Sequence, residues 1–214
     1  TSPVILGFPH TGLDVPEAIF ARLNETGKAL TDTDWHIHRL YQGLLPDVTT
    51  VRATFHRTVI DANRDPSGKS LYPGQNTTSL CALTDFDTRP LYHDDMEPDA
   101  AEIEARRVAF HAPYHAALAA EIERVRDLHG IAILYDCHSI RSVAPFLFEG
   151  TLPDFNIELT QKSHLASETH PFELDAAKAK KLRRHLSDIL VSIERWALDQ
   201  ASQTHPQTPK AHRS

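Results

Sequence analysis

Two histidines follow apolar segments that lie far apart in the chain. His10 follows the apolar run of residues 3–8, and His138 follows the apolar run of residues 131–135. Such runs are typical of buried strands, and the C-terminal ends of parallel strands meet at one edge of a sheet. Two imidazoles from such ends, joined by a ligand from a nearby loop, can hold a hydrolytic metal ion. The sequence therefore predicts a metal site at His10 and His138, with zinc as the expected ion and another divalent metal as the alternative.

The third ligand remains open on these grounds. A carboxylate is expected, because zinc in a hydrolytic site commonly combines two histidines with Asp or Glu. The candidates near His10 in the sequence are Asp14, Asp32, Asp34 and the imidazole of His36. Asp136 stands two residues before His138. We expect it to point away from that histidine and to support the site without binding the metal.

Three arginines lie beside the expected strand ends and turns, namely Arg57, Arg64 and Arg141. A guanidinium group presents a planar fork of donors that matches a carboxylate. Each arginine alone is more often a surface or ion-paired residue. Their common position near the histidines favours a small acidic substrate.

The elements that must position these side chains alternate between strand and helix. Apolar runs predict strands at residues 3–8, 48–55 and 131–135. Helical spacing predicts helices at residues 16–23, at 35–41 after an N-cap in 31–34, at 102–128 before Gly130, and at 174–198. This order is typical of an α/β fold, with the strand at 131–135 buried in a parallel sheet. We expect one domain over residues 1–200 and a polar tail over 201–214.

Composition excludes several classes of partner. The chain of 214 residues carries 22 Lys and Arg against 29 Asp and Glu, a formal charge of −7, which argues against nucleic-acid binding. No apolar run approaches the roughly 20 residues that span a bilayer, so no membrane partner is expected. Two cysteines are too few for a disulfide framework, and no secretion signal precedes the first strand, so we expect a cytoplasmic protein. Composition predicts no oligomeric state.

Six blocks of sequence, in order along the chain, resemble the N-formylglutamate amidohydrolase family. The blocks are residues 9–12 (Pro-His-Thr-Gly), 32–36 (Asp-Thr-Asp-Trp-His), 59–64 (Val-Ile-Asp-Ala-Asn-Arg), 70–75 (Ser-Leu-Tyr-Pro-Gly-Gln), 136–142 (Asp-Cys-His-Ser-Ile-Arg-Ser) and 147–156 (Leu-Phe-Glu-Gly-Thr-Leu-Pro-Asp-Phe-Asn). The resemblance implies a zinc-carboxypeptidase-like (phosphorylase/hydrolase-like) fold, with a mixed, mostly parallel central sheet flanked by helices. It also implies metal-dependent hydrolysis of N-formyl-L-glutamate to formate and L-glutamate, a step of histidine degradation.

The same resemblance implies a role for each site residue. Asp34 would join His10 and His138 as the third zinc ligand. The substrate carboxylates would bind Arg57, Asn63, Arg64 and Arg141. Glu158 would be the general base toward the water that attacks the formyl group, and His36 would orient Asp34 or assist at the oxyanion. The segment from His10 lacks the His-x-x-Glu spacing of the carboxypeptidases, so the third ligand is the assignment that the resemblance supports least.

The resemblance breaks after Asn156 and resumes at Ile157. On the order of 50 residues are missing there by comparison with the family, a sizeable fraction of a domain. An internal deletion and a segment left out of the sequence are the two explanations, and we favour the second, because a deletion would leave central strand edges unpaired. Two rival functions stay open: a related zinc amidohydrolase acting on another N-acyl amino acid, and a catalytically inactive binding protein on the same fold.

Overall fold

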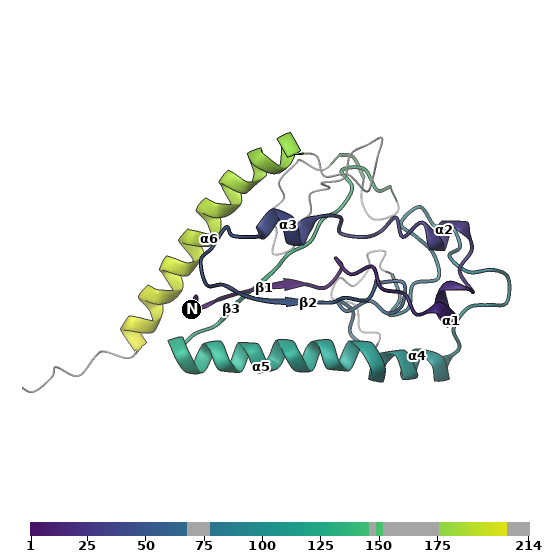
Figure 1. Cartoon of the computed structure of the whole chain (residues 1–214), viewed down its shortest axis with the longest axis horizontal. Helices are drawn as coiled ribbons and strands as arrows, with labels where there is room; N and C mark the ends of the chain where they lie inside the picture. Colours follow the sequence, from purple (N-terminus) through teal and green to yellow (C-terminus); the bar gives the residue numbers. More distant parts are fainter. Residues whose placement is uncertain (68–77, 146–148, 152–175, 205–214) are drawn as a thin grey trace, which may run out of the picture.

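A three-stranded parallel sheet forms the centre of the protein (Figure 1). The computed structural model describes residues 1–67, 78–145, 149–151 and 176–204. Strand β1 (Val4–Phe8) lies between β2 (Thr49–Arg52) and β3 (Ile133–Asp136). All three strands run in the same direction, so their C-terminal ends share one edge. The predicted α/β fold with a parallel sheet is confirmed, and the three predicted strands are all present.

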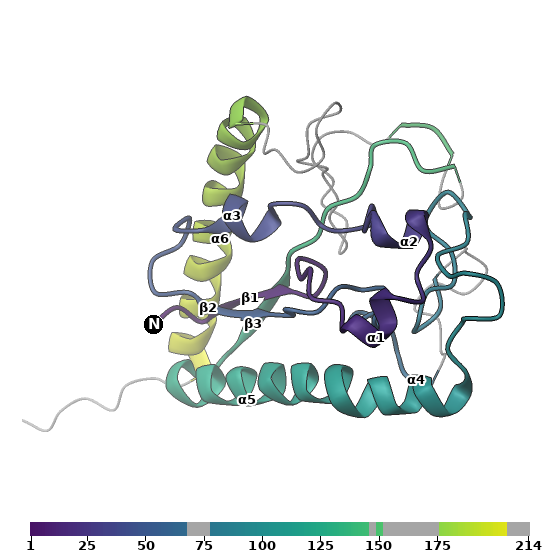
Figure 2. The same ribbon diagram turned by 45° about the vertical axis from the view of Figure 1, so that its right-hand side comes forward.

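Helices cover both faces of β1 (Figures 1 and 2). Val4, Leu6 and Phe8 pack in a core cluster with α3 (Ile37–Tyr41) and α6 (Ala176–Thr204). Ile5 points the other way, into a cluster that includes residues of α5 (Ala112–His129). Burial on both faces explains why residues 3–8 are a continuous apolar run with no polar alternation.

Strand β3 differs from its prediction. We expected a strand buried on both faces, yet its residues alternate between half-buried and exposed, and Leu134 is 41% exposed. Within the described ranges β3 pairs only with β1 and forms an edge of the sheet. The apolar run at 131–135 therefore predicted the strand correctly, but the prediction that this strand is buried on both faces was wrong.

The helix expected over residues 16–23 is shorter than predicted, since α1 spans Glu17–Phe20, and a further short helix, α2 (Glu25–Lys28), was not predicted. The side chain of Asn24 accepts a hydrogen bond from Gly27 N and caps α2. The predicted N-cap of α3 within residues 31–34 is wrong. The helix begins after His36, whose φ of 62° is left-handed, and the carboxylate of Asp34 is engaged elsewhere.

The long helix predicted at 102–128 is present and continuous from α4 (Ala100–Arg106) to the end of α5. Asp99 caps its start, and Gly130, with φ of 74°, ends it in the left-handed conformation. The π-helical turn η1 (Arg107–His111) joins α4 to α5 and was not predicted. At the other end of the chain the helix predicted at 174–198 is present as α6, which continues to Thr204. Among the described residues, no helix combines the length and apolar character that a membrane span requires.

Candidate metal centre

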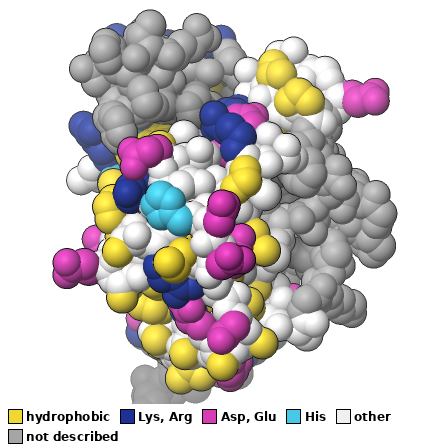
Figure 3. Space-filling model, turned by 90° about the vertical axis from the view of Figure 1, so that its right-hand side faces the viewer, with side chains coloured by type: hydrophobic (Ala, Val, Ile, Leu, Met, Phe, Trp, Pro, Cys, Tyr) yellow, Lys and Arg dark blue, Asp and Glu magenta, His cyan; other side chains and the backbone are white. Residues whose placement is uncertain are grey.

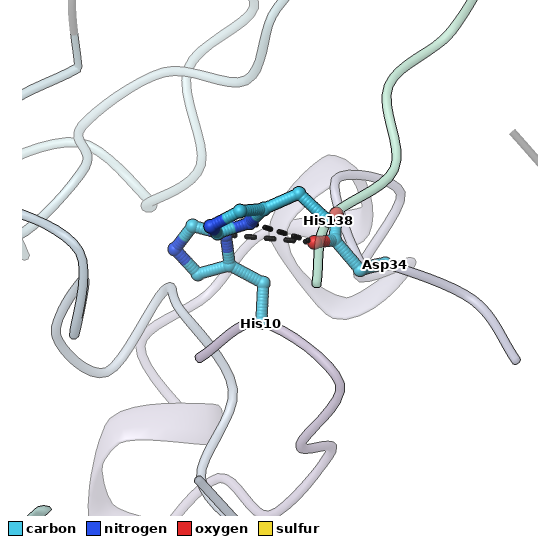
Figure 4. A group of neighbouring side chains, drawn as sticks. All are labelled: His10, Asp34 and His138. Carbon is cyan, nitrogen blue, oxygen red and sulfur yellow. Dashed lines mark hydrogen bonds and ion pairs between the residues drawn. The ribbon is translucent and has the colours of Figure 1, made fainter. Parts of the chain in front are cut away.

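Three side chains from distant parts of the chain meet beyond the C-terminal ends of β1 and β3. His10, Asp34 and His138 each offer one ligand atom, and these atoms lie within 4.8 Å of one another. Figure 4 shows both rings directed at the same carboxylate oxygen. Asp34 Oδ2 is 3.1 Å from His138 Nδ1 and 3.7 Å from His10 Nδ1. The two imidazole rings are tilted by 51° to each other, with centroids 4.9 Å apart.

Backbone hydrogen bonds bring these loops together. The N–H of Asp34 donates to the carbonyl of His10 at 3.0 Å, which ties the segment before α3 to the loop after β1. The N–H of Cys137 donates to the carbonyl of Gly7 at 2.8 Å and extends the pairing of β3 with β1 by one residue. His138 follows directly, so the sheet itself determines where this imidazole lies.

The buried ion pair of Asp61 and Arg57 supports His10 at its Nε2 atom. Asp61 Oδ1 accepts a hydrogen bond from His10 Nε2 at 2.7 Å, and Asp61 Oδ2 accepts another from Arg57 Nη2 at 2.6 Å. Both side chains of the His10–Asp61 pair are almost fully buried. With Nε2 used as a donor, Nδ1 of His10 carries the lone pair that faces Asp34. A carboxylate behind a metal-binding histidine is a common arrangement, because it orients the ring and makes it more basic.

His138 is held by two acidic side chains. Its Nδ1 faces Asp34, its Nε2 lies 2.9 Å from Asp136 Oδ2, and the amide Nδ2 of Asn63 lies 3.3 Å from the same Nε2. The expectation that Asp136 points away from His138 is wrong, because residues two apart in an extended segment project to the same side. Gly7 leaves room for Asp136, since a Cβ at that position would lie 2.7 Å from Asp136 Oδ1.

The charges of the cluster shift the pKa values of its members. Burial alone would raise the pKa of Asp34, but the interactions of this carboxylate with the neighbouring imidazoles of His10 and His138 outweigh burial and lower it. Arg57 and His10 likewise hold the pKa of the buried Asp61 well below its usual range. Burial opposes a charge on His138, yet the hydrogen bonds with Asp136 and Asp34 raise its pKa to about 9. The site therefore holds two carboxylates in their charged form, and a metal ion bound here would displace the proton that Asp136 and Asp34 stabilise on His138.

The residues fit a zinc ion. Two imidazoles and one carboxylate converge, and the second nitrogen of His10 is held by a buried carboxylate, as zinc sites commonly show. Of the four candidates for the third ligand, Asp34 is the one in the cluster. The remaining three are placed as follows: Asp32 accepts from the N–H of Phe86 at 3.0 Å, Asp14 is exposed, and the ring of His36 lies beside Trp35 at the start of α3.

Of the four predicted substrate-binding residues, Asn63 contacts the cluster, and the three arginines are engaged by other groups of this chain. Asn63 reaches the cluster through its contact with His138. Arg57 is buried, paired with Asp61 and stacked over the ring of Phe86, which gives it a supporting position behind His10. Arg64 donates to Thr78 O and Thr78 Oγ1, both at 3.1 Å.

Arg141 forms a bidentate pair with Asp87, with N···O distances of 3.0 and 2.9 Å. Both side chains are about one-third exposed. Figure 3 shows basic and acidic side chains interspersed on one face of the molecule, an arrangement typical of paired surface charges. The fork of Arg141 is thus engaged by a carboxylate of this chain.

Glu158, the predicted general base, lies outside the described residues, as do the block at 70–75 and the junction after Asn156. Sequence reasoning missed Asp61, although this residue belongs to the block at 59–64. The signal was the spacing of Arg57 and Asp61, four residues apart on either side of an apolar run that the structure buries completely.

Comparison with known proteins identifies related sequences. A family described as N-formylglutamate amidohydrolase matches residues 2–205. The N-formylglutamate deformylase of Pseudomonas aeruginosa is 44% identical over 156 residues, 72% of this chain and 58% of the relative. The protein of the same name from Pseudomonas putida is 40% identical over the same shares. The chain therefore spans less than two thirds of the length of these curated relatives.

Two solved structures share the fold. The crystal structure of N-formylglutamate amidohydrolase from Ralstonia eutropha superimposes with a TM-score of 0.57 and 27% identity, over 72% of this chain and 60% of that one. A protein of Agrobacterium tumefaciens gives a TM-score of 0.52 at 22% identity, over 70% of this chain and 56% of that one. The arrangement of the parallel sheet and its helices is therefore one that solved proteins also adopt.

Proposed function

This chain belongs to the N-formylglutamate amidohydrolase family, and on that premise we propose that the protein hydrolyses N-formyl-L-glutamate to formate and L-glutamate. The observation that supports the proposal most directly is the convergence of His10, Asp34 and His138 at the sheet edge. We propose zinc, or another divalent metal, as the ion that these three side chains hold. When bound, such an ion polarises a carbonyl oxygen and makes a water molecule more acidic.

The chain's own residues then have separate tasks. Asp61 holds His10 in one tautomer, with Arg57 behind it, so that Nδ1 stays directed into the site. Asn63 stands next to His138 and is placed to donate from its amide to a substrate oxygen. Glu158 is proposed as the general base that accepts a proton from the attacking water and returns it to the departing amine. His36 is proposed to orient Asp34 or to assist at the oxyanion.

The two carboxylates of the substrate require cationic partners. We propose Arg141 and Arg64 for this role, since both present guanidinium donors near the ends of the loops that carry His138 and Asn63. The pair of Arg141 with Asp87 is partly exposed to solvent, so it contributes little energy, and a substrate carboxylate can take the place of Asp87.

The deciding experiment is formate release from N-formyl-L-glutamate by the purified protein, measured with added zinc and again after chelation. Chelator-sensitive release supports both the reaction and the metal. N-acetyl-L-glutamate is the matched control, because it differs from the substrate by one methyl group. Faster turnover of N-acetyl-L-glutamate would indicate a related amidohydrolase of different acyl preference. Folded, zinc-loaded protein that turns over neither compound would indicate a binding protein on the same fold.

We place this reaction in the cytoplasm, as a step of histidine degradation. Both cysteines, Cys81 and Cys137, are buried free thiols, which is compatible with a reducing compartment. The acidic formal charge of −7 supports a small-molecule substrate and no nucleic-acid partner.

A further inference from the structure

Two histidines of the long helix hold the loop that lies next to the metal centre. His111 Nε2 is 2.9 Å from the carbonyl oxygen of Arg64, and His115 Nε2 is 2.9 Å from the carbonyl oxygen of Ala62. A carbonyl oxygen only accepts, so Nε2 is the protonated nitrogen in both rings. The rings stack on each other, with centroids 4.3 Å apart and an interplanar angle of 35°.

The other side of the same loop contacts both imidazoles of the proposed metal site. Asp61 holds His10 at 2.7 Å, and the side chain of Asn63 lies 3.3 Å from His138. Asp61 also accepts from the N–H of Asn63 at 2.8 Å, so the two residues are linked directly. The loop of residues 61–64 therefore lies between the helix and the metal centre, with carbonyls bound on one side and side chains bound on the other.

The π-helical turn η1 makes this contact feasible. Arg106 donates to the carbonyl of Val59 at 3.0 Å, so it faces the same stretch of chain as His111, five residues later. In an α-helix, five residues advance by about 500° and would place the two side chains on different faces. A π turn bonds residues five apart and returns the chain to the same face. Pro113, which has no N–H to continue the α-helical pattern, is the second residue after the turn.

We propose that His111 and His115 are positioning residues for the metal centre. By donating to the carbonyls of Arg64 and Ala62, they set where Asp61 meets His10 and where Asn63 meets His138. Loss of either donor lets the loop shift. The shift weakens the support of His10 and His138 and displaces Arg64 at the same time. The inference rests on the proposed metal site, and only its effect on KM rests on the proposed reaction.

The test compares variants of His115 in the full chain. His115→Phe keeps the stacked ring and removes the donor, and His115→Gln restores an N–H near the position of Nε2. We expect zinc affinity, measured by competition with a chromogenic chelator, to fall about tenfold in His115→Phe and to return to within about threefold in His115→Gln. KM for N-formyl-L-glutamate should rise with zinc Kd, while kcat at saturating zinc and substrate changes less.

His129→Ala is the matched control, since His129 is the last residue of α5 and its Nε2 lies 3.1 Å from the Thr1 hydroxyl, away from the loop of residues 61–64. Wild-type zinc affinity in a folded His115→Phe protein would overturn the inference. Equal loss in His115→Phe and His115→Gln would also overturn it, because the donor would then not be the cause. Should His115→Phe fail to fold, the same comparison is made with His111→Phe and His111→Gln. If wild-type protein binds zinc and releases no formate, the proposed function fails and the affinity comparison still decides the positioning role.

Discussion

Asp61 and His10 form a hydrogen bond of 2.7 Å in the interior, with side-chain exposures of 1% and 4%. Because Asp61 is also paired with Arg57, its carboxylate cannot rotate away without leaving a buried guanidinium alone. The tautomer of His10 is therefore set by residues that do not belong to the metal centre itself. Core stability and metal affinity are therefore linked through Asp61.

Asp61→Asn should weaken both zinc binding and the fold. The substitution removes the charge that compensates buried Arg57, so we expect a loss of about 3–5 kcal/mol in the free energy of unfolding. Zinc affinity should fall about 10- to 100-fold, because the support of His10 is lost. Denaturant unfolding and chelator competition measure the two effects. Glu104→Gln is the control: it breaks an exposed pair with Arg107 and should leave the free energy of unfolding close to the wild-type value.

Asp34→Asn should separate the candidates for the third ligand. Asp34 is the carboxylate that faces both imidazoles, so its loss should lower zinc affinity by more than about a hundredfold. Asp32→Asn and Asp14→Asn serve as controls and should bind zinc as the wild type does. A zinc Kd unchanged in Asp34→Asn would remove this residue from the ligand set.

Asp87→Asn should lower KM for N-formyl-L-glutamate. The substitution frees the fork of Arg141 from a partly exposed pair worth up to about 1 kcal/mol, which corresponds to a change of at most about fivefold. Arg141→Ala should have the opposite effect and raise KM. Steady-state kinetics at fixed zinc measures both, with Arg124→Ala, which breaks an exposed pair with Glu121, as the control. A higher KM in Asp87→Asn would mean that Asp87 holds Arg141 in place for the substrate.

Glu158→Gln should retain zinc and lose turnover by at least about a hundredfold, the usual contribution of a general base. The side chain keeps its size and loses the ability to accept the proton of the attacking water. Zinc content and kcat, measured on the same preparation, separate the two properties. Unimpaired kcat would exclude Glu158 from the mechanism.

His56 should make the protein less stable in mild acid. Burial, and secondarily the neighbouring charge of Arg57, lowers the pKa of His56 to about 3, against 6.5 in the unfolded chain. Between these values the unfolded state binds the extra proton. The contribution of His56 is thus complete above pH 6.5 and falls by about 1.4 kcal/mol for each pH unit below it.

Denaturant unfolding of wild type and His56→Asn at pH 7, 6 and 5 measures this slope. The asparagine oxygen can accept from the N–H of Thr58, as Nδ1 of His56 does at 3.1 Å, and it does not titrate. The variant should therefore lose less stability than the wild type between pH 7 and pH 5. Parallel slopes would show that other groups govern acid sensitivity.

The parts of the fold that sequence could predict are those with a regular pattern. The apolar runs before His10 and His138 indicated β1 and β3, and the meeting of the two imidazoles followed from parallel strands. Gly130 marked the end of α5 correctly. These features depend on local periodicity and on one rule of sheet geometry.

The remaining parts depend on contacts between distant segments. Asp34 was one of four candidates, because its choice depends on a backbone bond to His10 that no spacing reveals. The left-handed conformation of His36 displaced the expected cap of α3. The exposure of β3 could not be inferred from its apolar residues, since burial depends on which strands stand beside it.

The π turn between α4 and α5 also determines how this helix tolerates changes in length. Removing one residue from the turn, such as the 56% exposed Val108, would leave Arg106 and His111 four apart, and a regular α-helix keeps such residues on one face. Adding one residue would instead rotate all of α5 by about 100° and carry both histidines off the loop. At this point the helix can be shortened but not lengthened, although none of its residues binds the metal.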